Sequence, residues 1–139
     1  MTIISWSDKF SIGVEMIDEQ HKKLFLLVND LHNYINNGTD KDKIASALSS
    51  LIDYTGYHFQ EEEDYMFNVS YPRFEQHKAL HDNLKEQVQN FKLEFAEGRA
   101  NTEEFLDFLY QWLTKHIMEQ DKKIGKFMEL AVLRPIMQE

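Results

Sequence analysis

The chain has 139 residues, of which 42% are apolar and 13% aromatic, with no cysteine and a formal charge of −9 at pH 7. This composition excludes a disordered chain, a disulfide scaffold and any thiolate site, and the negative charge argues against a nucleic-acid or membrane partner. No apolar run approaches the roughly 18 residues of a spanning helix, and the start lacks the features of a secretory signal. We therefore expect a single cytoplasmic domain over residues 1–139.

Apolar side chains recur every three or four positions in four long segments. These segments predict helices at about residues 19–36, 40–66, 72–97 and 102–128. Asp18 and Asn101 are the expected N-caps of the first and last helix, Asn37-Gly38 is a left-handed stop, and Pro72 suits a first helical position.

An N-terminal arm (1–17) and a short tail (130–139) flank the predicted helices. The arm carries Trp6, Phe10, Ile12 and Val14, which are expected to cover the open end of the bundle; gating of access to the interior is the alternative. Short connections between long helices imply antiparallel neighbours. The sequence thus predicts an all-α fold, an up-down-up-down four-helix bundle.

Histidines stand on inward helix faces where leucine would be expected. His58 and Glu62 lie 11 and 7 residues before the turn at Val69, and His77 and His81 lie 8 and 12 residues after it. Since residues equally far from a turn lie at one height in an antiparallel pair, these side chains should share a layer.

The same count around the other two turns adds His21, His116 and Asp121 to this layer. Burying five imidazoles and two carboxylates without a cation would cost several kcal/mol for each unpaired charge. The layer therefore predicts a metal site. His32, 11 residues after His21, would lie roughly 16 Å along the helix axis and is expected to be a core or rim residue.

One spacing conflicts with a regular helix. His116 and Asp121 are five residues apart, which separates them by about 140° around an α-helix. We expect the last helix to be irregular or π-widened between these two residues.

The motifs WSDKFSIGVEMIDEQH (6–21), HFQEE (58–62), YPRFEQHKALH (71–81) and HIMEQD (116–121) resemble the hemerythrin family, and within it the single-domain bacteriohemerythrins. The resemblance covers nearly the whole chain. It implies two non-haem iron ions per chain, bridged by an oxo or hydroxo group and by the carboxylates of Glu62 and Asp121. It implies that one iron is bound by His77, His81 and His116. The other iron would be bound by His21 and His58.

If both irons are six-coordinate, these ligands leave one position vacant, on the iron held by His21 and His58. Neutral imidazoles outnumber carboxylates, unlike the glutamate-rich sites of ferritin-like oxidases, which favours oxygen binding over oxidation. The resemblance also implies an oxygen pocket lined by Leu24, Phe59, Trp112, Leu113 and Ile117, although each of these could simply be core. The remaining acids of the run Glu61–Asp64 are expected to be solvated.

The predicted function is reversible dioxygen binding for storage, transport or delivery by a monomer, not an enzyme. Two alternatives use the same centre: an oxygen or redox sensor acting through a partner, and a di-iron enzyme such as a peroxidase, nitric oxide scavenger or ferroxidase. A partner oxidase is compatible with the first function. Nitrogen and oxygen ligands alone also suit other metal ions.

Overall fold

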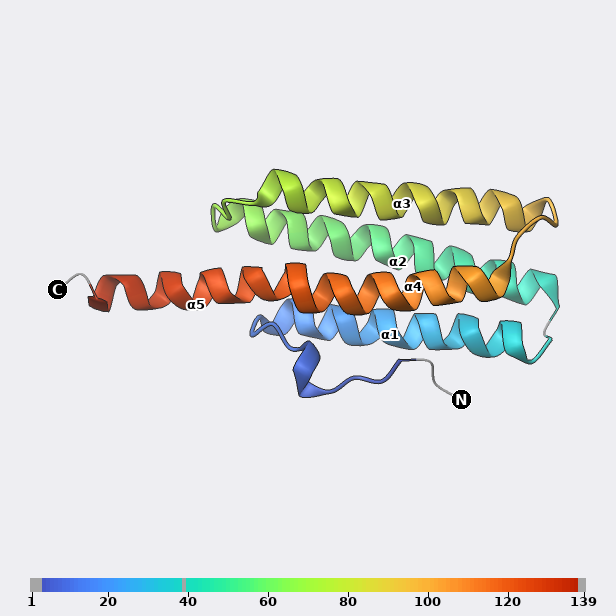
Figure 1. Ribbon diagram of the computed structural model, residues 1–139, viewed down its shortest axis with the longest axis horizontal. Helices are drawn as coiled ribbons and strands as arrows, with labels where there is room; N and C mark the ends of the chain where they lie inside the picture. Colours follow the sequence, from blue (N-terminus) through green and yellow to red (C-terminus); the bar gives the residue numbers. More distant parts are fainter. Residues whose placement is uncertain (1–3, 39, 138–139) are drawn as a thin grey trace.

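A computed structural model describes residues 4–38 and 40–137 as an antiparallel four-helix bundle with an N-terminal arm (Figure 1). The arm contains one turn of 3-10 helix, η1 (Asp8–Phe10). Three legs of the bundle are α1 (Glu15–Asn36), α2 (Lys41–Asn68) and α3 (Phe74–Ala96). The fourth leg is a continuous rod of α4 (Thr102–Lys115), the π-helix η2 (His116–Asp121) and α5 (Lys122–Met137). The predicted all-α, up-down-up-down bundle is confirmed.

Side-chain caps and a left-handed glycine form three of the helix ends, of which the Asn101 cap and the Gly38 stop were predicted. Asp40 precedes α2 and accepts hydrogen bonds from the backbone N–H groups of Asp42 and Lys43, and Asn101 accepts one from Glu104 at the start of α4. Gly38 has φ +65°, which suits a residue without a Cβ after the end of α1.

The start of α1 differs from the prediction. The helix begins at Glu15 and its N-cap is Val14, so Asp18 lies inside the first turn. The Asp18 carboxylate accepts hydrogen bonds from Ser11 Oγ at 2.6 Å and from the Ile12 backbone N–H at 2.8 Å. An acidic side chain is favourable at either place near a helix N-terminus, so the sequence pattern did not separate a cap from a first-turn residue.

Two further boundaries were predicted wrongly. α3 begins at Phe74, and Pro72 lies in the preceding turn. The expected tail is mostly helix, because residues 126–134 contain no glycine or proline and α5 runs on to Met137; residues 138–139 lie outside the described residues. Figure 1 shows α5 projecting beyond the turn that joins α2 to α3.

The arm lies along the flank of α1 rather than only over the end of the bundle (Figure 1). Phe10 is buried and meets the Phe25 ring edge-on at 5.1 Å. Further along, the Ile4 backbone exchanges two hydrogen bonds with the Asn29 side chain. The arm therefore covers apolar core, and gating of access to the interior remains the alternative.

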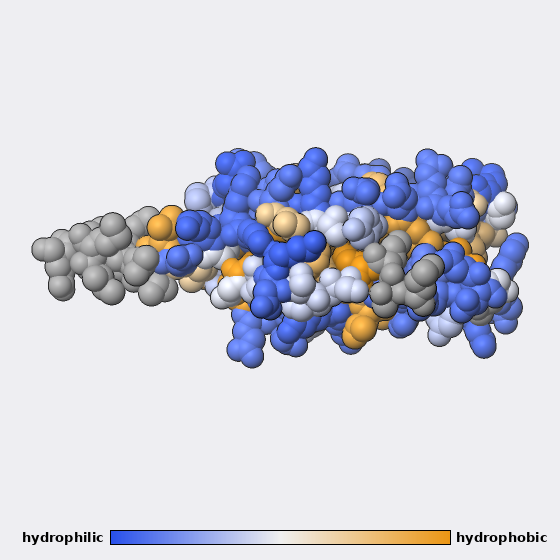
Figure 2. All heavy atoms as spheres, turned by 60° about the horizontal axis from the view of Figure 1, so that its bottom comes forward, coloured by the Kyte–Doolittle hydropathy of each residue, from blue (hydrophilic) through white to orange (hydrophobic). Residues whose placement is uncertain are grey.

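The surface is predominantly hydrophilic on the face seen in Figure 2, with apolar side chains showing between the polar ones. Among the described helices, none has the length and apolar character needed to cross a membrane.

Candidate metal centre

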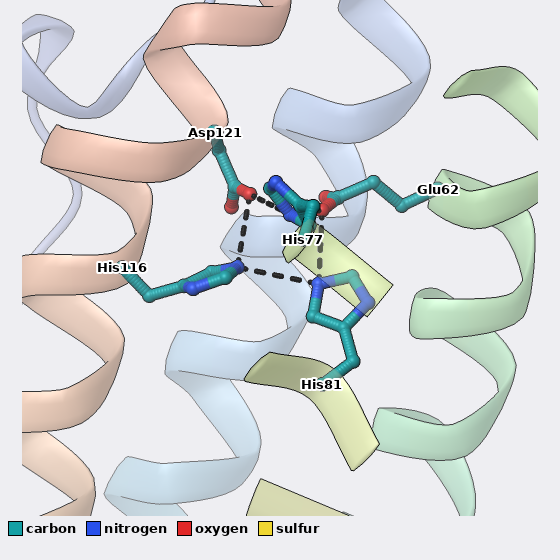
Figure 3. Close-up of side chains that lie close together, drawn as sticks. All are labelled: Glu62, His77, His81, His116 and Asp121. Atoms are coloured by element: carbon teal, nitrogen blue, oxygen red, sulfur yellow. Dashed lines mark hydrogen bonds and ion pairs between the residues drawn. The ribbon is translucent and has the colours of Figure 1, made fainter. Parts of the chain in front are cut away.

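Seven buried polar side chains meet in one interior layer of the bundle. α1 contributes His21, α2 contributes His58 and Glu62, α3 contributes His77 and His81, and the two ends of η2 contribute His116 and Asp121. Each is at most 6% exposed, so the layer is shielded from water. Figure 3 shows five of these side chains pointing at one another from three of the four legs of the bundle. The layer expected from turn distances is therefore present.

Glu62 lies between two groups of histidines. Its Oε1 atom is 2.7 Å from His77 Nε2 and 3.1 Å from His81 Nε2. Its Oε2 atom faces the other way, 3.2 Å from His58 Nε2 and 3.5 Å from His21 Nε2. One carboxylate thus presents one oxygen to each group.

Asp121 repeats this division from the opposite leg of the bundle. Its Oδ1 atom is 3.0 Å from His77 Nε2 and 3.1 Å from His116 Nε2, and its Oδ2 atom is 3.0 Å from His21 Nε2. The donor atoms therefore separate into a group with three histidines and a group with two. Both carboxylates contribute an oxygen to each.

Several polar atoms of the layer have no hydrogen-bond partner among the other described side chains, and their arrangement suits a bound cation. Within the described residues, Glu62 Oε2, both Asp121 oxygens and both His21 nitrogens are buried without a hydrogen-bond partner. His81 Nε2 and His116 Nε2 also face each other at 3.2 Å. Lone pairs that converge in a dry interior are stabilised by a shared positive ion. Two groups of possible ligand atoms share Glu62, and within each group the atoms lie within 4.8 Å of one another.

In the metal-free chain, protons on buried histidines supply the positive charge that a metal ion would otherwise supply. Burial works against protonation of His21 and His77, but the Asp121 and Glu62 carboxylates beside each ring outweigh it and raise the pKa of each imidazole to about 9. Burial would likewise raise the pKa values of Glu62 and Asp121, yet the surrounding imidazoles hold both well below their usual range. Burial dominates at His58 and lowers its pKa. The carboxylates are thus anionic and ready to bind a cation.

The predicted irregularity between His116 and Asp121 is confirmed, because these residues bound the π-helix η2. A π-turn holds more residues than an α-turn, so it brings positions five apart towards one face. Asp121 consequently points at the histidines of the layer instead of away from them (Figure 3).

Two polar residues that no sequence motif indicated contact the outer nitrogens of two of these histidines. His58 Nδ1 donates to Gln20 Oε1 at 2.7 Å, and His81 Nδ1 donates to Glu63 Oε2 at 2.9 Å. Glu63 is buried, so the expectation that Glu63 is solvated was wrong. A usable signal existed, because Glu63 lies one turn from Phe59 and one turn from Met66, both of which are buried.

The five residues expected to line an oxygen pocket all lie close to the interior layer or in the core beside it. Leu24, Leu113 and Ile117 are buried. The Phe59 ring stacks on His81 at 3.8 Å, and the half-buried Trp112 stacks on His116 at 4.3 Å. Trp112 also lines a surface hollow of about 150 Å³ beside His116. Their role in binding oxygen remains a prediction.

His32 stays apart from the seven, as expected. It is half-buried and its Nε2 atom lies 2.9 Å from Asn36 Nδ2.

Comparison with known proteins gives one consistent result. Residues 12–127 match the family described as the hemerythrin HHE cation binding domain. The bacteriohemerythrin of Clostridium acetobutylicum is 34% identical over 85% of this chain and 95% of its own length. That of Methylococcus capsulatus is 35% identical over 90% of this chain and 96% of its own length. A crystal structure of wild-type hemerythrin aligns with a TM-score of 0.84 at 34% identity, covering 89% of this chain and 96% of the other. The chain therefore belongs to the hemerythrin family.

Proposed function

We propose that this protein binds dioxygen reversibly at a non-haem di-iron centre and serves as an oxygen store or carrier. The proposed iron ligands are the seven buried residues of the interior layer: His21, His58, Glu62, His77, His81, His116 and Asp121. The observation that carries the proposal is the division of the donor atoms. Each carboxylate offers one oxygen to a group of three histidines and the other to a group of two, which is the arrangement that two bridged cations require.

The ligand types support binding rather than oxidation. Five of the seven proposed ligands are imidazoles, which bind a metal in their neutral form, whereas anionic oxygen ligands favour the higher oxidation states that follow cleavage of the oxygen–oxygen bond. When bound, the iron pair would supply the electrons that hold dioxygen reversibly. The chain's own contribution is to orient the imidazoles, which the hydrogen bonds at His58 Nδ1 and His81 Nδ1 do before any metal arrives.

The apolar side chains around the layer would keep water away from the iron. The Phe59 and Trp112 rings cover the faces of His81 and His116, and Leu24 is buried one turn from His21. A dry wall limits the entry of water and protons, which would otherwise convert a reversible complex into oxidised metal. We propose that these side chains form part of the oxygen pocket.

Metal analysis combined with an anaerobic-to-aerobic absorption spectrum tests the proposal. We expect two irons per chain and an absorption band that appears with oxygen and disappears under vacuum over repeated cycles. A protein that takes up iron but oxidises irreversibly within seconds contradicts reversible binding. Rapid turnover of peroxide, nitric oxide or ferrous iron by the same sample would instead favour the enzyme alternative.

A pair of histidine variants tests the assignment of the ligands. His58→Ala should lose the iron of the two-histidine group and with it the oxygen band, because His58 Nε2 faces Glu62 Oε2. His32→Ala is the matched control, since it removes an imidazole outside the layer. Equal iron content and equal oxygen spectra in the two variants would contradict the assignment.

A further inference from the structure

The two hydrogen bonds behind the candidate ligands differ in charge. His81, in the three-histidine group, donates its Nδ1–H to the carboxylate of Glu63 at 2.9 Å. His58, in the two-histidine group, donates to the side-chain amide of Gln20 at 2.7 Å. Glu63 is 5% exposed and Gln20 is 8% exposed, so neither acceptor is replaced by bulk water.

The charge of the acceptor affects the nitrogen at the other side of the ring. A carboxylate that accepts the Nδ1–H polarises the imidazole and makes Nε2 a stronger donor to a metal, whereas a neutral amide does so less. His81 Nε2 points into the layer, 3.1 Å from Glu62 Oε1. Glu63 is therefore connected to the candidate metal position through a single ring.

Packing holds this connection in one geometry. Phe59 lies flat on the His81 ring, with 3.8 Å between the centroids and 1° between the planes. Glu63 follows Glu62 on α2, so one helix positions both the carboxylate that faces the metal layer and the carboxylate behind His81. The ring has little freedom to exchange Glu63 for another acceptor.

We propose that Glu63 is a positioning residue that makes the two metal positions electronically unequal. Through His81 it strengthens binding at the three-histidine position and stabilises the higher oxidation state of a metal held there. Gln20 provides no such charge at the two-histidine position. This inference rests on the proposed function only in taking a metal to occupy the interior layer.

Glu63→Gln is the direct test, because glutamine keeps the volume and an acceptor oxygen while removing the charge. We expect Zn²⁺ affinity, measured by chelator competition, to fall by about 10- to 100-fold at one of two sites, and the reduction potential of the iron-loaded protein to rise. Asp64→Asn is the matched control, since it removes the same charge from an exposed neighbour whose carboxylate contacts Gln60. Equal affinities and potentials in the two variants would overturn the proposal.

Gln20→Glu gives a second test that does not require Glu63→Gln to fold. Adding a charge behind His58 should lower the reduction potential relative to the wild type, whereas Gln60→Glu on the exposed surface of α2 should not. If the Gln20→Glu and Gln60→Glu variants have the same reduction potential, the proposed effect of acceptor charge is overturned.

The outcomes also separate this inference from the proposed function. If the wild type binds metal without binding oxygen, the proposed function fails and the Zn²⁺ comparison still tests Glu63. If oxygen binds reversibly and Glu63→Gln matches its control, only this inference fails.

Discussion

Gly125 in α5 lies against the backbone of the N-terminal arm at Ile12. A Cβ built on Gly125 would overlap the backbone oxygen of Ile12 and lie 2.8 Å from its carbonyl carbon. Backbone atoms cannot rotate away as a flexible side chain can. We therefore expect Gly125→Ala to force the arm away from α5.

Two opposing effects determine the sign of the change in stability. Alanine is favoured over glycine in a helix by about 1 kcal/mol. Displacing the arm exposes Phe10 and Ile12, which are now 4% and 6% exposed, and burial of each such side chain contributes roughly 1.5–3 kcal/mol. Even if only one of the two loses its contacts, the loss exceeds the gain. Gly125→Ala should therefore lower the free energy of unfolding by about 0.5–5 kcal/mol.

Urea unfolding of the metal-free protein, followed by circular dichroism, measures this difference, and limited proteolysis reports release of the arm. Gly56→Ala in α2 is the control, because a Cβ there would meet nothing within 4 Å, so the helix gain of about 1 kcal/mol should appear alone. If Gly125→Ala proves as stable as Gly56→Ala, with the arm equally resistant to protease, the close packing of the arm on α5 is refuted.

Three further predictions concern the helix ends and the pH dependence. Ser70 has φ +57° after α2, so Ser70→Gly should stabilise the protein by about 1 kcal/mol in chemical denaturation. Asp40→Ala removes the acceptor of two backbone N–H groups and should destabilise it by about 1 kcal/mol in the same assay. Because folding raises the pKa values of His21 and His77 from 6.5 to about 9, their contribution is complete below pH 6.5 and is lost as the pH rises through 9. The metal-free protein should thus unfold at lower urea concentration at pH 9 than at pH 6.5, whereas metal affinity should rise with pH, since binding displaces these protons.

The elements that the sequence predicts well are those whose signal is local and repeated. The inward faces of the long helices follow from apolar periodicity, and Asp40, Asn101 and Gly38 mark ends through the chemistry of single residues. The interior layer of histidines and carboxylates could be predicted from the helix rise and the positions of the turns alone. Errors of one or two residues in a turn shift the heights by only a few ångströms.

The features that the sequence did not predict depend on contacts between elements. Asp18 and Glu63 are acidic residues at positions where an acid usually faces solvent or caps a helix. Asp18 instead accepts two hydrogen bonds from the arm, and Glu63 accepts one from His81 on a neighbouring helix. The donors that these carboxylates meet lie elsewhere in the sequence. The apolar neighbours of Glu63 one turn away indicate that it is buried, but no local pattern indicates which group it binds.

The π-helix links the candidate metal centre to the arm. His58 and Glu62, like His77 and His81, are four residues apart, a spacing that a regular helix brings to one face without distortion. The extra residue before Asp121 turns that carboxylate inward and also rotates every later residue of the rod by about 100° relative to an unbroken helix. In this register Ile124 is fully buried and Gly125 meets the backbone of Ile12. A single local distortion therefore determines both where Asp121 points and which face of α5 receives the arm, so a change that regularised η2 should disturb both together.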